Sequence, residues 1–195
     1  KVHVIVYDLL PLQHPEWINP KTTSNFKCWI KWLATYADNA ICISETVRKD
    51  LAKWINRKYS LECGALPYDH ISLGADIEST APSTGMSHEA ESLLGRMSKT
   101  PSLLMVGSLE PRKGHDQVLA AFDDLEKRCG FGSPLAQAIL IIVGRPAWKS
   151  EALQQKIRMH PQVGKKVIWF DQASDALLLQ LYASCSAVIV ASRAE

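Results

Sequence analysis

The second half of the chain alternates short apolar segments with longer segments whose apolar residues recur at helical spacing, and this alternation constrains the fold most. Strands that alternate with helices of this length form parallel sheets with helices on both faces. The pattern predicts strands at 103–106, 138–143, 166–170 and 186–190, and helices at 115–128, 149–159 and 175–184. The second half is therefore predicted to be an α/β unit with a doubly wound parallel sheet.

The carboxyl ends of these predicted strands are polar. In parallel sheets, ligands bind beyond the carboxyl ends of the strands, where the connecting loops meet. Here the loops begin with Gly107-Ser108, Gly144-Arg145, Phe170-Asp171 and Ala191 to Glu195. Two begin with glycine and three carry charged residues. A polar rim over a buried sheet is the geometry expected of a nucleotide site.

Arg112 and Lys113 stand where the helix after the first of these strands is expected to begin. Cations at a helix start are unfavourable by roughly 0.3–1 kcal/mol, because that end already carries partial positive charge. A bound phosphate would reverse the sign, since backbone N–H groups, a close approach at Gly114, a bidentate Arg112 and a point charge on Lys113 would surround it. From these residues alone, a phosphate cradle and a pair of solvated loop residues both remain open.

The first half shows a shorter and less regular version of the same alternation. Val2 to Tyr7 is predicted to be a strand buried on both faces. Further elements are expected as a helix at 24–37, a strand at 40–43, a helix capped by Ser44 and a strand around 70–73. The segment 79–101 is rich in Ser, Thr, Pro and Gly around a short helical piece, and we expect a linker there.

Composition narrows the class of protein. A hydrophobic content of 47% is enough for a sizeable core, and a net charge of +2 without a basic run argues against a nucleic-acid partner. Five scattered cysteines without metal-ligand spacing favour reduced thiols and a cytoplasmic protein. Because the chain begins inside one strand and stops just past another, we expect a fragment of a longer protein, with little or no activity by itself.

Several segments, in their order and spacing, resemble the retaining GT-B glycosyltransferases usually called family 4 (glycosyl transferases group 1). The segments are YDLLPLQHPE (7–16), ICISETVRKDL (41–51), ISLGAD (71–76), VGSLEPRKGHDQVLAAF (106–122), IIVG (141–144), SDALLLQLY (174–182) and ASRAE (191–195). The resemblance implies two Rossmann-like parallel-sheet domains, both incomplete here. Residues 1–78 would be the end of the acceptor domain, 79–101 the linker and 102–195 the first half of the donor domain.

The same resemblance implies a reaction, in which a hexosyl unit moves from a nucleotide-diphosphate sugar to a hydroxyl of a glycan or lipid-linked acceptor, with retention. The overall similarity of segments 7–16 and 106–122 to this family favours mannose, from GDP-mannose, as the donor sugar. Two alternatives stay open, a GT-B nucleotide-sugar epimerase or hydrolase and a non-catalytic nucleotide-sugar-binding domain. The absence of G-x-G-x-x-G after the first strand, of a P-loop motif and of G-x-S-x-G argues against dehydrogenases, P-loop NTPases and serine hydrolases.

The implied catalytic residues are Arg112 and Lys113, which would hold the diphosphate as the sugar leaves, and Glu195, which would contact the hydroxyls of the donor sugar. For Glu195, a solvated side chain at the chain end is the alternative. The implied donor-binding set adds Gly107, Ser108, Gly144, Arg145, Phe170 and Asp171; Asp171 stands where the family usually has glycine. Arg145 would touch phosphate or ribose, or be a solvated loop residue. No cofactor or metal is expected, because the sequence lacks Asp-x-Asp and fixed cations would replace a metal.

One predicted helix also interleaves cations with aromatic residues, at Lys27 to Trp32. Two interpretations remain open: peripheral contact with an anionic membrane, at its inner face and next to a lipid-linked acceptor, or ordinary packing of Trp29, Ile30 and Leu33.

Overall fold

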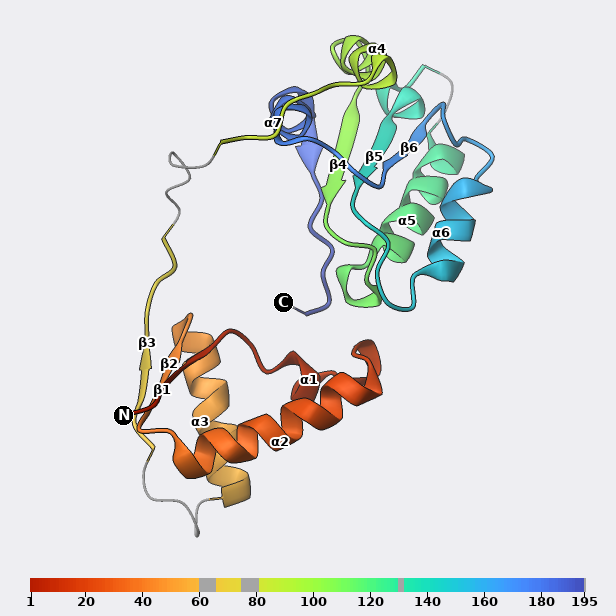
Figure 1. The fold of residues 1–195 in the computed structure, drawn as a ribbon. Coiled ribbons are helices and arrows are strands. Elements are labelled where there is room, and N and C mark those ends of the chain that lie inside the picture. Colours follow the sequence, from red (N-terminus) through yellow and green to blue (C-terminus); the bar gives the residue numbers. More distant parts are fainter. Residues whose placement is uncertain (60–65, 75–80, 130–131, 195) are drawn as a thin grey trace. The chain divides into compact units, whose positions relative to one another are not determined.

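The structure is a computed structural model, which describes residues 1–59, 66–74, 81–129 and 132–194. The chain divides into two compact units, Lys1–Ser79 and Thr80–Ala194. Each unit contains its own parallel sheet with its own helices (Figure 1). In the part of the chain that is described, no helix is long and apolar enough to cross a membrane.

The first unit is built around a three-stranded parallel sheet of order β1-β2-β3. Its strands are β1 (His3–Val6), β2 (Asn39–Cys42) and β3 (Tyr68–His70). Its helices are α1 (Leu10–Gln13), the 3-10 turn Pro15–Trp17, α2 (Pro20–Tyr36) and α3 (Glu45–Tyr59). Ser44 caps α3 as expected, because its hydroxyl accepts a hydrogen bond from the N–H of Val47 at 3.2 Å.

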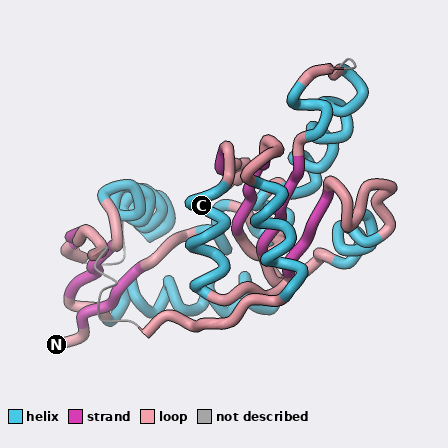
Figure 2. The backbone as a smooth tube through the Cα atoms, turned by 90° about the horizontal axis from the view of Figure 1, so that it is seen from above, coloured by secondary structure: helices cyan, strands magenta, loops and turns pink. Residues whose placement is uncertain are grey.

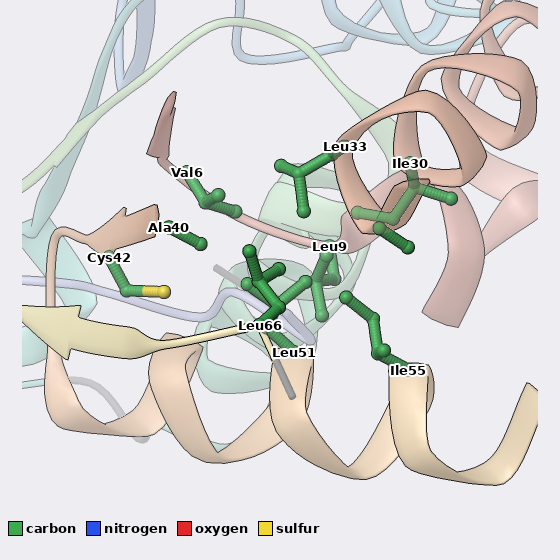
Figure 3. Close-up of a cluster of buried hydrophobic side chains, with 10 residues drawn as sticks. Val6, Leu9, Ile30, Leu33, Ala40, Cys42, Leu51, Ile55 and Leu66 are labelled. Carbon is green, nitrogen blue, oxygen red and sulfur yellow. The ribbon is translucent and has the colours of Figure 1, made fainter. Parts of the chain in front are cut away.

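The core of the first unit lies between the sheet and the helices α2 and α3. Ile30 and Leu33 of α2 and Leu51 and Ile55 of α3 are buried at helical spacing. They meet Val6, Leu9, Ala40, Cys42 and Leu66, as Figure 3 shows.

β1 differs from its prediction, because it is not buried on both faces. Val4 and Val6 belong to the core, but Ile5 between them is 53% exposed. Successive side chains of a strand point to opposite faces, and β1 lies at the edge of a sheet whose described core is on one face. The expectation of a strand buried on both faces was therefore wrong.

The second unit contains a four-stranded parallel sheet of order β6-β5-β4-β7. The elements are α4 (His88–Met97), β4 (Ser102–Val106), the 3-10 turn Pro111–Lys113, α5 (His115–Arg128), the 3-10 turn Pro134–Gln137, β5 (Ile139–Val143), α6 (Glu151–Arg158), β6 (Val167–Phe170), α7 (Asp175–Ser184) and β7 (Ala187–Val188). All the strands and helices expected after residue 102 are present, so the doubly wound parallel sheet is confirmed (Figure 2).

Both faces of this sheet are covered. Along β5, Ile139, Ile141 and Val143 pack on the side of α4 and α7, whereas Leu140 and Ile142 pack on the side of α5 and α6 (Figure 1). All five residues of β5 are buried, as expected for a central strand of a parallel sheet.

Residues 88–97 of the expected linker form a helix that packs into the second unit. Ala90, Leu93 and Met97 of α4 are buried in the cluster that contains Leu104 and Ile141. Ser87 caps the helix, because its hydroxyl accepts from the N–H of Ala90 at 3.2 Å. The division into an acceptor domain, a linker and a donor domain remains a prediction.

Candidate functional site

The strand register brings the predicted loops to one edge of the second sheet. Val106, Val143 and Phe170 are partners across β4, β5 and β6, so Gly107, Gly144 and Asp171 each follow a paired position. The N–H of Gly107 donates to the carbonyl of Val143, and the N–H of Gly144 to that of Phe170, both at 2.9 Å. The polar rim expected at the carboxyl edge is therefore present.

The loops after β4 and β5 run side by side, and glycine permits it. A Cβ on Gly144 would overlap the carbonyl oxygen of Gly107. One step further on, the N–H of Leu109 donates to the carbonyl of Arg145 at 2.9 Å. Gly144 is thus required for close contact between two backbones, which is one of the uses of glycine at a strand end.

Arg112 and Lys113 lie on a separate 3-10 turn, Pro111–Lys113, rather than in the first turn of α5. Gly114 follows with φ 77°, in the left-handed region, and α5 begins only at His115. A Cβ on Gly114 would collide with the carbonyl of Ala191. Glycine therefore separates the turn from the helix, and the two cations precede the helix start.

Glu110 orients Arg112. The Nε of Arg112 donates to Oε2 of Glu110 at 2.8 Å, and the hydroxyl of Ser108 donates to Oε1 of the same carboxylate at 2.6 Å. Burial opposes ionisation of Glu110, but the hydrogen bond from Ser108 and the charges of Arg112 and Lys113 outweigh it, so the pKa of Glu110 lies below its ordinary value. The guanidinium is held by an ionised partner, and its side chain is only 15% exposed.

The segment that precedes Glu195 is tied to the same turn. A guanidinium N–H of Arg112 donates to the carbonyl of Ala194 at 3.1 Å, and the N–H of Arg193 donates to the carbonyl of Arg112 at 2.7 Å. Glu195 itself lies outside the described residues.

The other predicted site residues lie on the same rim with different exposures. Arg145 and Asp171 are exposed, whereas Phe170 is half-buried and packs into the core on the side of α4 and α7. The side chain of Lys113 passes over Gly107, with its Cδ 3.9 Å from where a Cβ of Gly107 would lie. Among the described residues, no group of three His, Cys, Asp or Glu side chains is placed to hold a metal ion.

Two residues of this site were not found from the sequence. Glu110 is two positions from Arg112, and only the turn geometry brings their side chains together. His115 is 1% exposed and opens α5. A signal for its burial was present, because His115 shares helical spacing with the buried Val118, Leu119 and Phe122.

Comparison with known proteins identifies the family. The family model described as "Glycosyl transferases group 1" matches residues 90–195, just over half of the chain and nearly all of the second unit. The chain belongs to this glycosyltransferase family. The match includes the turn that carries Arg112 and Lys113.

Curated relatives match along almost the whole chain. Two of them, from Escherichia coli, are both named "Serotype-specific mannosyltransferase WbdA" and are 41% and 40% identical over 193 residues. The alignment covers 98% of this glycosyltransferase chain but only 23% of each relative. The chain therefore spans about a quarter of the length of these relatives.

Solved structures show the fold. An alpha,alpha-trehalose-phosphate synthase (UDP-forming) from Burkholderia vietnamiensis matches with a TM-score of 0.61 at 13% identity, over 97% of this chain and 50% of that one. The N-terminal domain of a trehalose-6-phosphate phosphatase from Candida albicans matches with a TM-score of 0.62 at 13% identity, over 98% of this chain and 50% of that one. The α/β fold with parallel sheets is of the GT-B type, as the family resemblance implied.

Proposed function

We propose that the protein transfers a hexosyl unit from a nucleotide-diphosphate sugar to a hydroxyl of a glycan or lipid-linked acceptor. The observation that carries the proposal is the Pro111–Lys113 turn, where Glu110 holds Arg112 beside Lys113 at the carboxyl edge of the second sheet. Membership of the glycosyl transferases group 1 supports it. Mannose is the proposed sugar, because the relatives are named mannosyltransferases.

In this proposal the Pro111–Lys113 turn stabilises the leaving group, which is the nucleoside diphosphate. As the bond between the sugar and the phosphate breaks, the nucleoside diphosphate gains negative charge. Cations that are already oriented stabilise this charge without reorganising. In this proposal Arg112 and Lys113 replace a metal ion, Gly107 and Ser108 allow the diphosphate to approach, and Glu195 contacts the sugar.

The stereochemistry and the setting are parts of the same proposal. We propose retention, with the acceptor attacking on the face from which the diphosphate departs, because the sequence offers no obvious carboxylate nucleophile for a double displacement. We propose that the first unit binds the acceptor and that the protein acts in the cytoplasm, at the inner face of a membrane. In α2, Trp29, Ile30 and Leu33 pack into the core, which is the ordinary packing that the sequence left open as the alternative. Support for the peripheral contact comes from other residues of the same helix, because Trp32 and Tyr36 are 44% and 65% exposed and Lys31 is exposed as well.

A double variant tests the site. We expect Arg112→Ala/Lys113→Ala to lower turnover by about 100-fold or more when it is introduced into the intact protein, meaning the full-length protein that contains this chain. This is the usual effect of removing groups that stabilise charge in the transition state. The measurement is release of nucleoside diphosphate from a panel of nucleotide-diphosphate sugars, with the melting temperature recorded to verify folding.

A matched control is available on the same helix. Lys127→Ala/Arg128→Ala removes an equal charge from the far end of α5, and we expect donor binding and turnover to stay unchanged. Wild-type turnover in the Arg112→Ala/Lys113→Ala protein would contradict the site assignment.

A further inference from the structure

His115 is a buried polar side chain that directly follows the Pro111–Lys113 turn and Gly114. It is 1% exposed, and neither ring nitrogen has a hydrogen-bond partner among the described residues. The next buried residues of α5 on this stripe are Val118, Leu119 and Phe122, which are all apolar. Because a buried and unsatisfied polar group is destabilising, an apolar residue would serve packing better than histidine does.

The backbone of Gly107 is within reach of the ring and acts on its protonation, although no hydrogen bond of standard geometry joins them. Burial, as the largest effect, and the charge of Lys113 lower the pKa of His115 below its ordinary value, although the Gly107 backbone and Asp116 act to raise it. A backbone group that raises the pKa of an imidazole must be an acceptor, and hence the carbonyl of Gly107. A neutral imidazole retains one N–H, which can donate to such a carbonyl.

The carbonyl of Gly107 and the N–H of Ser108 belong to the same peptide group, so the direction of one fixes the direction of the other. In a trans peptide the carbonyl and the following N–H point in opposite directions. The carbonyl of Gly107 is directed at Gly144, because a Cβ there would overlap its oxygen, so the N–H of Ser108 is directed away from Gly144. Among the described residues this N–H has no hydrogen-bond acceptor, and the side chain of Lys113 passes over the neighbouring Gly107.

We propose that His115 is a positioning residue, which donates its ring N–H to the carbonyl of Gly107 and thereby holds the N–H of Ser108 toward a phosphate oxygen of the bound donor. His115 does not touch the donor itself. When the donor binds, two hydrogen bonds form: the imidazole N–H of His115 donates to the carbonyl of Gly107, and the N–H of Ser108 donates to a phosphate oxygen. The inference rests on the proposed function, because it assigns a role within the same diphosphate site.

Two variants of His115 test the role of the ring N–H, with GDP and UDP as probes and binding to the intact protein measured by calorimetry. We expect His115→Leu to weaken binding of the preferred nucleotide by about 5- to 10-fold, the value of one ordinary hydrogen bond, and not to lower the melting temperature. We expect His115→Gln, which retains an N–H donor, to restore most of this affinity. A purely structural role would produce the opposite pattern, a lower melting temperature and unchanged affinity.

His160 is the matched control. It is buried at 8% exposure, but both ring nitrogens are satisfied: Nε2 pairs with Asp123 at 2.7 Å and Nδ1 accepts from the N–H of Gln162 at 3.1 Å. We expect His160→Leu to lower the melting temperature and to leave nucleotide affinity unchanged.

A measurement on the wild-type protein does not depend on folding of any variant. Saturation with the preferred nucleotide is expected to shift the ring nitrogen resonances of His115 and to slow exchange of its N–H, as seen by NMR with labelled histidine. Two outcomes would overturn the inference: His115 resonances that do not move on nucleotide binding, or wild-type affinity in His115→Leu. If Arg112→Ala/Lys113→Ala loses binding in the same assay, the proposed function survives and only the role of His115 fails. If the wild-type protein binds neither GDP nor UDP, the proposed function and the inference both fail.

Discussion

The two sheets of this chain are both parallel, yet they use their apolar strands differently. In the second unit, β5 is buried along its whole length because helices cover both faces. In the first unit, β1 alternates between the core and the surface because its described core lies on one face. Strand composition is similar, as HVIV and ILIIV illustrate. The difference teaches that burial of an apolar strand is decided by its neighbours.

The largest effect is expected when one isoleucine is replaced by alanine in each of the two sheets. Ile141 of β5 is fully buried and Ile5 of β1 is 53% exposed. We expect Ile141→Ala to lower the free energy of unfolding of the second unit by about 2 to 5 kcal/mol, because it removes buried methyl groups and leaves a cavity. For Ile5→Ala we expect about 1 kcal/mol or less in the first unit. Amide hydrogen exchange in increasing urea measures the two units separately, and equal losses would break the comparison.

A smaller effect is expected from the glycines that follow strands in the two units. Gly144, after β5, faces the carbonyl of Gly107, whereas a Cβ on Gly74, which follows β3 in the first unit, would meet nothing within 4 Å. We expect Gly144→Ala to lower the free energy of unfolding by about 1 to 3 kcal/mol through overpacking, and to weaken nucleotide binding because the loop after β4 must shift. Gly74→Ala should stay within about 0.5 kcal/mol of the wild type. Urea unfolding and nucleotide titration check the pair, and a neutral Gly144→Ala would show that this contact can relax.

The smallest effect concerns surface charge in the first unit. Arg48, with the help of Lys49, lowers the pKa of Glu45 from 4.5 to about 2. A depressed pKa means that the ionised carboxylate stabilises the fold above pH 4.5, and that this contribution is lost as the pH falls toward 2. We expect Glu45→Gln to lower the melting temperature slightly at neutral pH, with a difference from wild type that shrinks between pH 4.5 and pH 2. A difference independent of pH in thermal melts would show that the charge plays no part.

The sequence was sufficient for the order of elements in the second unit, because short apolar strands alternate there with longer segments that begin at recognisable helix starts. The bounds of α5 and α7 were predicted to the residue, since Gly114 and Ser174 mark their starts. Exposure of Ile5 and packing of α4 were not predicted, because both depend on which elements lie opposite. For the same reason the site prediction contained Arg112 and Lys113 but neither Glu110 nor His115, whose roles arise from turn geometry and from the backbone of Gly107.

The hydrogen bonds between Arg112 and the backbone at 193–194 join two segments about eighty positions apart. Each bond selects one particular backbone group of the later segment. An insertion or deletion between Val188 and Arg193 would offer Arg112 a different peptide, whereas a change of side chain at Ser192 would not. For these two hydrogen bonds the length of the segment is decisive, whereas its side chains act elsewhere: Ile189 and Ala191 pack into the core, and Arg193 pairs with Asp116.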